Sequence, residues 1–144
     1  IKNNLLEDNK NDYIIIYLQP TSPFRNNHHI DNSIQYFLKK NLRTLLSVNE
    51  NKNFFKSFYK NKTTLKSYFN SKLVSYNRQN LRKIYAPNGA IYIFYAKDFM
   101  RYKKINFFKT GYFLMNNIDS IDIDDKDDLK LAKFLSKKFI KINK

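Results

Sequence analysis

The stretch YIIIYLQPTSPFR, at residues 13–25, constrains the fold of this chain more than any other. Its first half, Tyr13 to Leu18, is an unbroken apolar and aromatic run, typical of a strand covered on both faces in an α/β protein. Pro20 and Pro23 end the strand, because each lacks a backbone donor and restricts the residue before it. The polar residues between them form a loop at the strand's carboxyl end, where open α/β sheets bind ligands. The pattern alone indicates a buried strand and a polar turn, and leaves the role of the loop open.

Apolar runs and helical stripes alternate along the rest of the chain. We predict helices near residues 28–39, 96–102 and 126–139, strands at 44–48, 90–95 and 112–115, a turn at 87–89, and small antiparallel strands within about 53–77. Residues 1–12 are predicted to end a helix that leads into the first strand. The fold class is therefore α/β, with a mainly parallel central sheet flanked by helices. At 144 residues the chain is interpreted as one domain, 1–144, in which the aromatic segment at about 53–77 could be an ordinary β-meander packed on the core.

The net charge of +15 permits two interpretations. Lys and Arg interleaved with Tyr and Phe are typical of a basic single-stranded nucleic-acid-binding module. The lysines are scattered through every segment rather than gathered on one predicted face, which favours a basic background composition. Such a charge would still attract a nucleoside triphosphate and an acidic sugar.

The chain contains no cysteine, which excludes a disulfide scaffold, thiol nucleophiles and Cys-type zinc sites. We see no secretory leader, and the longest apolar run is far shorter than a membrane span. We therefore expect a cytoplasmic protein without membrane association.

The phrase SIDID places Asp122 and Asp124 two residues apart, so in a strand both would point to the same face. Two such carboxylates can hold a hard cation such as Mg²⁺, with phosphate oxygens and water as the other ligands. Alternatively they are acidic residues that cap the following helix, where Asp125, Asp127 and Asp128 also stand. The bare pattern leaves both interpretations open.

Four phrases occur in a recognisable order: LQPTSPFR at 18–25, LLSV at 45–48, RQNLRKIYAPNGAIYI at 78–93 and SIDIDDKDDLKLA at 120–132. Their order and spacing resemble the N-acylneuraminate cytidylyltransferases, or CMP-sialic acid synthetases, and relatives acting on similar nonulosonic acids. The resemblance covers about residues 13–139, and it implies that the segment at about 53–77 is an insertion that makes the dimer contact and reaches the active site of the neighbouring subunit. It implies a nucleotidyltransferase that moves CMP from CTP to the anomeric hydroxyl of a nine-carbon acidic sugar, releases pyrophosphate, uses Mg²⁺ and forms a homodimer.

The resemblance also implies roles for single residues. The loop with Gln19 and Thr21 would line the acceptor pocket, and Asn88 and Tyr92 lie in the matching PNGAIYI segment, although Asn88 could instead serve a turn before Gly89. Arg78 and, from the insertion, Lys56 would approach the acidic sugar or phosphates from the neighbouring subunit. The implied substrate-binding residues are Gln19, Thr21, Lys56, Arg78, Asn88 and Tyr92, and the implied metal ligands are Asp122 and Asp124.

The chain departs from the family pattern in several places. It begins at Ile1 without a methionine, and nothing before Tyr13 resembles the glycine-containing basic loop that cradles the CTP phosphates. We therefore expect a fragment that lacks this loop and makes no CMP-sugar by itself at an appreciable rate. Phe107 and Phe108 match an aromatic pair that contacts the sugar, but at a shorter spacing from SIDID. No general base is identified, and the motifs do not rank sialic, legionaminic and pseudaminic acids as acceptors.

Overall fold

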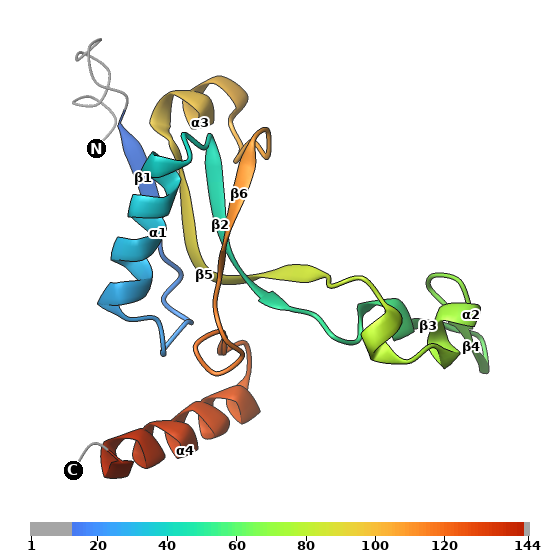
Figure 1. Cartoon of the computed structure of the whole chain (residues 1–144). Coiled ribbons are helices and arrows are strands. Elements are labelled where there is room, and N and C mark those ends of the chain that lie inside the picture. Colours follow the sequence, from blue (N-terminus) through green and yellow to red (C-terminus); the bar gives the residue numbers. More distant parts are fainter. Residues whose placement is uncertain (1–12, 143–144) are drawn as a thin grey trace.

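The computed structural model describes residues 13–142, apart from the side chains of residue 78 and of residues 139–142. The helix end predicted within residues 1–12 lies outside the described residues. Figure 1 shows a twisted sheet with a helix against one face, a long helix below it and a slender extension to one side. Within the described part of the chain, no helix combines the length and apolar character needed to cross a bilayer.

The elements follow one another in the order β1 (Ile14–Tyr17), α1 (Asn27–Lys39), β2 (Thr44–Glu50), η1 (Phe54–Lys56), β3 (Phe58–Asn61), β4 (Thr64–Ser67), α2 (Lys72–Ser75), η2 (Arg78–Asn80), β5 (Tyr85–Tyr95), α3 (Ala96–Tyr102), β6 (Thr110–Leu114) and α4 (Lys126–Ile142). The three helices predicted from apolar periodicity are all present, with slightly different ends. Asn26 caps α1 through its side chain, which accepts a hydrogen bond from the His29 backbone N–H.

The four-stranded sheet has the order β1-β5-β2-β6. β5 is antiparallel to both of its neighbours, whereas β2 and β6 are parallel. The α/β class is confirmed, but the predicted mainly parallel sheet is not, because only one of these three strand pairs is parallel. Since β1, β2 and β6 still share one direction, their carboxyl ends meet at the same end of the sheet.

β5 continues through the segment predicted as a turn at 87–89 and bends there (Figure 1). β2 pairs with β5 on both sides of the bend, and the register shifts between Leu46 and Val48. Gly89 adopts a φ of +77°, a conformation that residues with a side chain rarely adopt. The predicted turn is therefore wrong: the neighbouring strand supplies hydrogen-bond partners, and the glycine turns the segment into a bulge within one strand.

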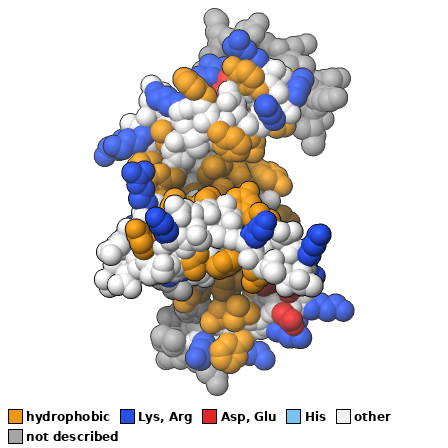
Figure 2. All heavy atoms as spheres, turned by 90° about the vertical axis from the view of Figure 1, so that its right-hand side faces the viewer, with side chains coloured by type: hydrophobic (Ala, Val, Ile, Leu, Met, Phe, Trp, Pro, Cys, Tyr) orange, Lys and Arg blue, Asp and Glu red, His pale blue; other side chains and the backbone are white. Residues whose placement is uncertain are grey.

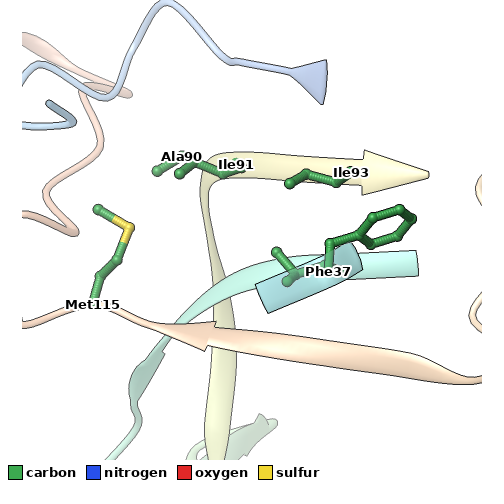
Figure 3. Close-up of a cluster of buried hydrophobic side chains, with 6 residues drawn as sticks. Phe37, Ala90, Ile91, Ile93 and Met115 are labelled. Carbon is green, nitrogen blue, oxygen red and sulfur yellow. The ribbon is translucent and has the colours of Figure 1, made fainter. Parts of the chain in front are cut away.

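The core lies between α1 and the sheet. Figure 3 shows Ala90, Ile91 and Ile93 along β5, Phe37 beside Ile93, and Met115 reaching in from the end of β6. Each large apolar side chain buried in this way contributes about 1.5–3 kcal/mol to folding. Because the cluster also includes Leu45 of β2, it holds four elements together and fixes the loops at their ends.

Residues 53–77 contain the antiparallel pair β3-β4 and extend away from the four-stranded sheet (Figure 1). We call this segment the arm. Phe54, Phe55 and Phe69 pack on one another at its base, with ring centroids 4.7–5.8 Å apart. Leu65 and Tyr68 are each 68% exposed. The arm thus orders a small aromatic cluster of its own and still leaves apolar surface in water.

Candidate active site

The loop after β1 and the segment after β6 meet at Gly89. The Ile123 backbone N–H donates to the Thr21 carbonyl oxygen at 2.9 Å, which joins the two segments. A Cβ added to Gly89 would overlap Gln19 Oε1 and would lie 3.2 Å from Asp122 Oδ2. The side chains of Gln19 and Asp122 therefore occupy the space beside the Gly89 backbone that another residue would fill.

We call the group formed by Gln19, Thr21, Gly89, Tyr92 and Asp122 the Gly89 cluster. Its members come from three segments that are far apart in the sequence. It lies at the carboxyl ends of β1 and β6, where polar side chains in open α/β sheets commonly meet ligands.

Arg25 fixes the backbone of this cluster. Its Nη1 donates to the carbonyl oxygen of Gln19 at 2.8 Å and to that of Ala90 at 2.9 Å. The guanidinium thereby ties the loop after β1 to β5. No local pattern in the sequence singles out Arg25, because its partners are main-chain carbonyl oxygens of two segments that only the fold brings together.

Asp122 and Asp124 do not lie in a strand, contrary to the prediction. Residues 121–124 are irregular, and Ile123 joins them to the loop after β1 by one backbone hydrogen bond. Asp122 is half-buried, and within the described structure its buried Oδ1 has no hydrogen-bond partner. Asp124 is exposed. The alternation of isoleucine and aspartate therefore gives the two carboxylates different surroundings.

The start of α4 is capped by other aspartates. Asp125 Oδ1 accepts hydrogen bonds from the backbone N–H groups of Asp128 at 2.9 Å and Asp127 at 2.8 Å. These two hydrogen bonds hold the pKa of Asp125 below its ordinary value, and the bond from the Asp128 N–H has the larger effect. Asp128 Oδ2 in turn accepts from the backbone N–H of Asp124 at 3.1 Å. Capping thus accounts for Asp125 and Asp128, and it leaves the carboxylate of Asp122 without a structural task.

An unpartnered carboxylate oxygen that is shielded from water costs free energy, so Asp122 is suited to a cation or to a donor on a ligand. Within residues 13–142 no group of three or more His, Cys, Asp or Glu side chains could hold a metal ion. A cation bound through Asp122 would therefore need further ligands from the substrate or from water. Mg²⁺ commonly binds in this way, through one or two carboxylates and substrate phosphates.

Tyr92 lies on β5 opposite Tyr17 of β1, and their ring centroids are 5.8 Å apart. Burial, followed by the neighbouring Tyr17 and the charge of Asp122, raises the pKa of Tyr92. Its phenol consequently remains a protonated hydrogen-bond donor beside a carboxylate. Tyr17 was not singled out in the sequence, where it reads only as the last aromatic residue of a buried run.

Asn88 is a buried link between strands. Its Oδ1 accepts from Ser47 Oγ at 2.5 Å and from the Ala90 N–H at 3.2 Å, while its Nδ2 donates to Ser120 Oγ at 2.8 Å. These bonds join β2, β5 and the segment after β6. They favour the alternative in which Asn88 serves the backbone rather than a ligand.

The remaining predicted residues lie elsewhere. Lys56 belongs to η1 in the arm, which extends away from the four-stranded sheet in Figure 1. Arg78 begins η2, and its side chain lies outside the described residues. Phe107 and Phe108 directly precede β6, at the opposite end of the sheet from the cluster. A single chain therefore gathers Gln19, Thr21, Tyr92 and Asp122, and does not bring Lys56 or the phenylalanine pair to them.

No family model matches the chain. It is similar to curated proteins that are N-acylneuraminate cytidylyltransferases. The one from Streptococcus agalactiae serotype III (strain NEM316) is 30% identical over 130 residues, which cover 87% of this chain and 30% of the relative. The one from Escherichia coli O18:K1:H7 (strain RS218 / NMEC) is 30% identical over 125 residues, or 84% of this chain and 29% of the relative. The chain thus spans about 30% of the length of these relatives, and the resemblance that its motifs indicate is confirmed.

Proposed function

We propose that this chain supplies the acceptor-sugar and metal-binding part of a cytidylyltransferase. The reaction transfers CMP from CTP to the anomeric hydroxyl of a nonulosonic acid and releases pyrophosphate. The observation that supports this most directly is the meeting of Gln19 and Asp122 at Gly89, since these residues come from three phrases by which the sequence resembles the family.

The cluster suits an acidic, hydroxyl-rich sugar. The Gln19 amide and the Thr21 hydroxyl offer neutral hydrogen bonds, and the protonated phenol of Tyr92 adds a donor. Gly89 has no side chain, so the sugar can approach the backbone closely. Direct attack of the anomeric hydroxyl on the α-phosphorus requires orientation and charge neutralisation rather than a protein nucleophile.

Asp122, with Asp124, would hold Mg²⁺ in this proposal. The bound cation would draw negative charge from the phosphates of CTP. The chain's own contribution is to present the buried Oδ1 of Asp122, which stands beside Gly89 and has no hydrogen-bond partner in the described structure. Asp124 is exposed, so we expect it to contribute less than Asp122.

The activity is tested by measuring CTP consumption and CMP-sugar formation across a panel of nonulosonic acids. Since Gly89 and Gly111 are the only glycines, the chain has no glycine-rich phosphate loop, and we expect turnover only after fusion to that loop from a relative. In the fusion, Asp122→Asn should lower the rate by about a hundredfold or more, roughly 3 kcal/mol of transition-state stabilisation. Asp127→Asn is the matched control, because Asp127 is exposed and, among the residues that the structure describes, forms an ion pair with Lys130 alone. Equal rates in both variants would remove the metal assignment.

We also propose that the protein is a homodimer joined through the arm. Leu65 and Tyr68 leave apolar surface on it, and an exposed cluster of this kind is typical of an interface. In such a dimer the arm would carry Lys56, and the segment that follows it would carry Arg78, toward the Gly89 cluster of the second copy. Light scattering should report a dimer that Leu65→Lys weakens. Leu38→Lys is the control, since Leu38 is also exposed but lies on α1; a monomer at high concentration would contradict the proposal.

The alternative, a single-stranded nucleic-acid-binding module, has less support. Figure 2 shows Lys and Arg side chains spread from one end of the visible face to the other, with apolar side chains between them. A strand-binding groove would instead need the cations in a row beside stacked rings.

A further inference from the structure

A hollow lies at the end of the sheet where β2 and β6 begin, opposite the Gly89 cluster. Its volume is about 420 Å³, within the range of small-molecule sites. Arg43, Asp98, Arg101, Tyr102, Phe108 and Lys109 are among the residues that line it. We call it the α3 pocket, because α3 supplies one of its walls. No residue of the Gly89 cluster contributes to it, and Phe108, which matches a family aromatic residue in the sequence, lies here rather than at that cluster.

The α3 pocket carries excess positive charge. Arg43 is ion-paired with Asp98 and lies 5.2 Å from the centroid of the Tyr95 ring, so its guanidinium is held in place. Arg101 lies 5.3 Å from the centroid of the Tyr102 ring, which orients a second guanidinium. Among the described residues, neither Arg101 nor Lys109 forms an ion pair. Two cations in a hollow without matching carboxylates attract an anion.

Phe108 stands at the rim of the pocket and is 73% exposed. The loop that carries it is ordered by hydrogen bonds: Asn106 Oδ1 accepts from the Phe108 N–H at 3.1 Å. The carbonyl oxygen of Asn106 accepts from Thr44 Oγ1, and that of Lys109 accepts from the Arg43 N–H at 3.2 Å. An apolar ring that an ordered loop holds in water is available to stack against a ligand.

We propose that the α3 pocket binds a nucleoside phosphate, with the phosphates against Arg101 and Lys109 and the base against Phe108. Arginine and lysine are the usual partners of phosphate oxygens, and any base can stack on a phenylalanine ring. A nucleic-acid strand would need several free rings along an extended groove, whereas of the two exposed rings that line this pocket Tyr102 is already covered by the Arg101 guanidinium, which leaves Phe108 for one base. The proposal does not depend on the cytidylyltransferase activity, because the two sites share no residue and lie at opposite ends of the sheet.

Calorimetry on the 144-residue chain at about 150 mM salt tests this, with ADP, inorganic pyrophosphate and adenosine as probes. ADP should bind more tightly than pyrophosphate or adenosine. The double variant Arg101→Glu/Lys109→Glu should weaken ADP binding by about tenfold or more. The matched control Lys133→Glu/Lys137→Glu changes the net charge equally on the exposed side of α4, and should weaken it by less than about twofold.

Phe108→Ser should weaken the binding of ADP and leave that of pyrophosphate unchanged, while Asp122→Asn should leave both unchanged. Equal losses of ADP affinity in the two double variants would show that the effect is general electrostatic attraction and would overturn the proposal. So would failure of the folded chain to bind ADP, or equal affinity for ADP and pyrophosphate. If an oligothymidylate binds more tightly than ADP and its binding depends on Arg101 and Lys109, the ligand of the pocket is a nucleic-acid strand, and the proposal of a nucleoside phosphate is wrong.

Discussion

Replacing Gly89 by alanine tests the geometry of the Gly89 cluster through two separate effects. The backbone at this position has a φ of +77°, which a residue with a Cβ adopts only under strain. The new methyl group would also overlap Gln19 Oε1 and would come within 3.2 Å of Asp122 Oδ2. The first effect acts on stability, and the second displaces a residue proposed to bind the sugar.

The two effects differ in size. The left-handed backbone costs a non-glycine residue roughly 1–2 kcal/mol. The overlap with Gln19 costs little, because Oε1 is the far end of a flexible side chain that can turn away. Since a free-energy change of about 1 kcal/mol moves the melting temperature of a domain of this size by roughly 3–4 °C, Gly89→Ala should lower it by roughly 3–8 °C.

Urea unfolding of the wild type, Gly89→Ala, Gln19→Ala and the double variant completes a cycle that separates the effects. We expect Gly89→Ala to cost the same free energy of unfolding in both backgrounds, to within about 0.5 kcal/mol. A cost that disappears when Gln19 is alanine would show that steric overlap dominates. An unchanged stability in Gly89→Ala would refute the left-handed backbone and the bulge in β5.

Three further outcomes are expected. Asn88→Ala should lower the free energy of unfolding by about 2–4 kcal/mol, because it removes the buried hydrogen bonds of Asn88 to Ser47 Oγ, Ser120 Oγ and the Ala90 N–H, and urea unfolding measures this. Asp122→Asn should bring the pKa of Tyr92 closer to 10.0, since it removes a charge that raises it, and ¹³C NMR titration of the tyrosine ring will report the change. Because the pKa of Asp125 is lowered, its ionised form stabilises the fold above pH 3.8, and this contribution is lost as the pH falls below that value. Asp125→Asn should therefore show a shallower acid unfolding curve than the wild type. Parallel curves would contradict the capping role.

The helices and most strands could be predicted because their patterns are local. The apolar stripe from Ile30 to Leu38 and the cap before it specify α1, and the run after Thr44 specifies β2. The order of motifs also pointed to Gln19 and Asp122, which the fold brings together. These features depend on residues close together in the chain and on short motifs in a recognisable order, and both can be seen in a sequence.

Strand direction could not be predicted in the same way. The run from Ala90 to Tyr95 is apolar throughout because strands cover both of its edges and side chains pack on it, and this holds for an antiparallel strand as well as for a parallel one. Equally, the alternation around Asp122 and Asp124 says nothing about whether a partner strand is present. The contributions of Tyr17 and Arg25 depend on which strands become neighbours, so no local pattern announces them.

The two hydrogen bonds of Arg25 have a consequence for how this site can diversify. Both are accepted by main-chain carbonyl oxygens, those of Gln19 and Ala90, so they depend on the path of the backbone and not on the side chains of these residues. Substitutions at Gln19 or Thr21 therefore leave the hydrogen-bonded link between the loop and β5 in place. Related chains that retain such a link can exchange the side chains of this loop, and with them the groups offered to a ligand, while the scaffold stays the same.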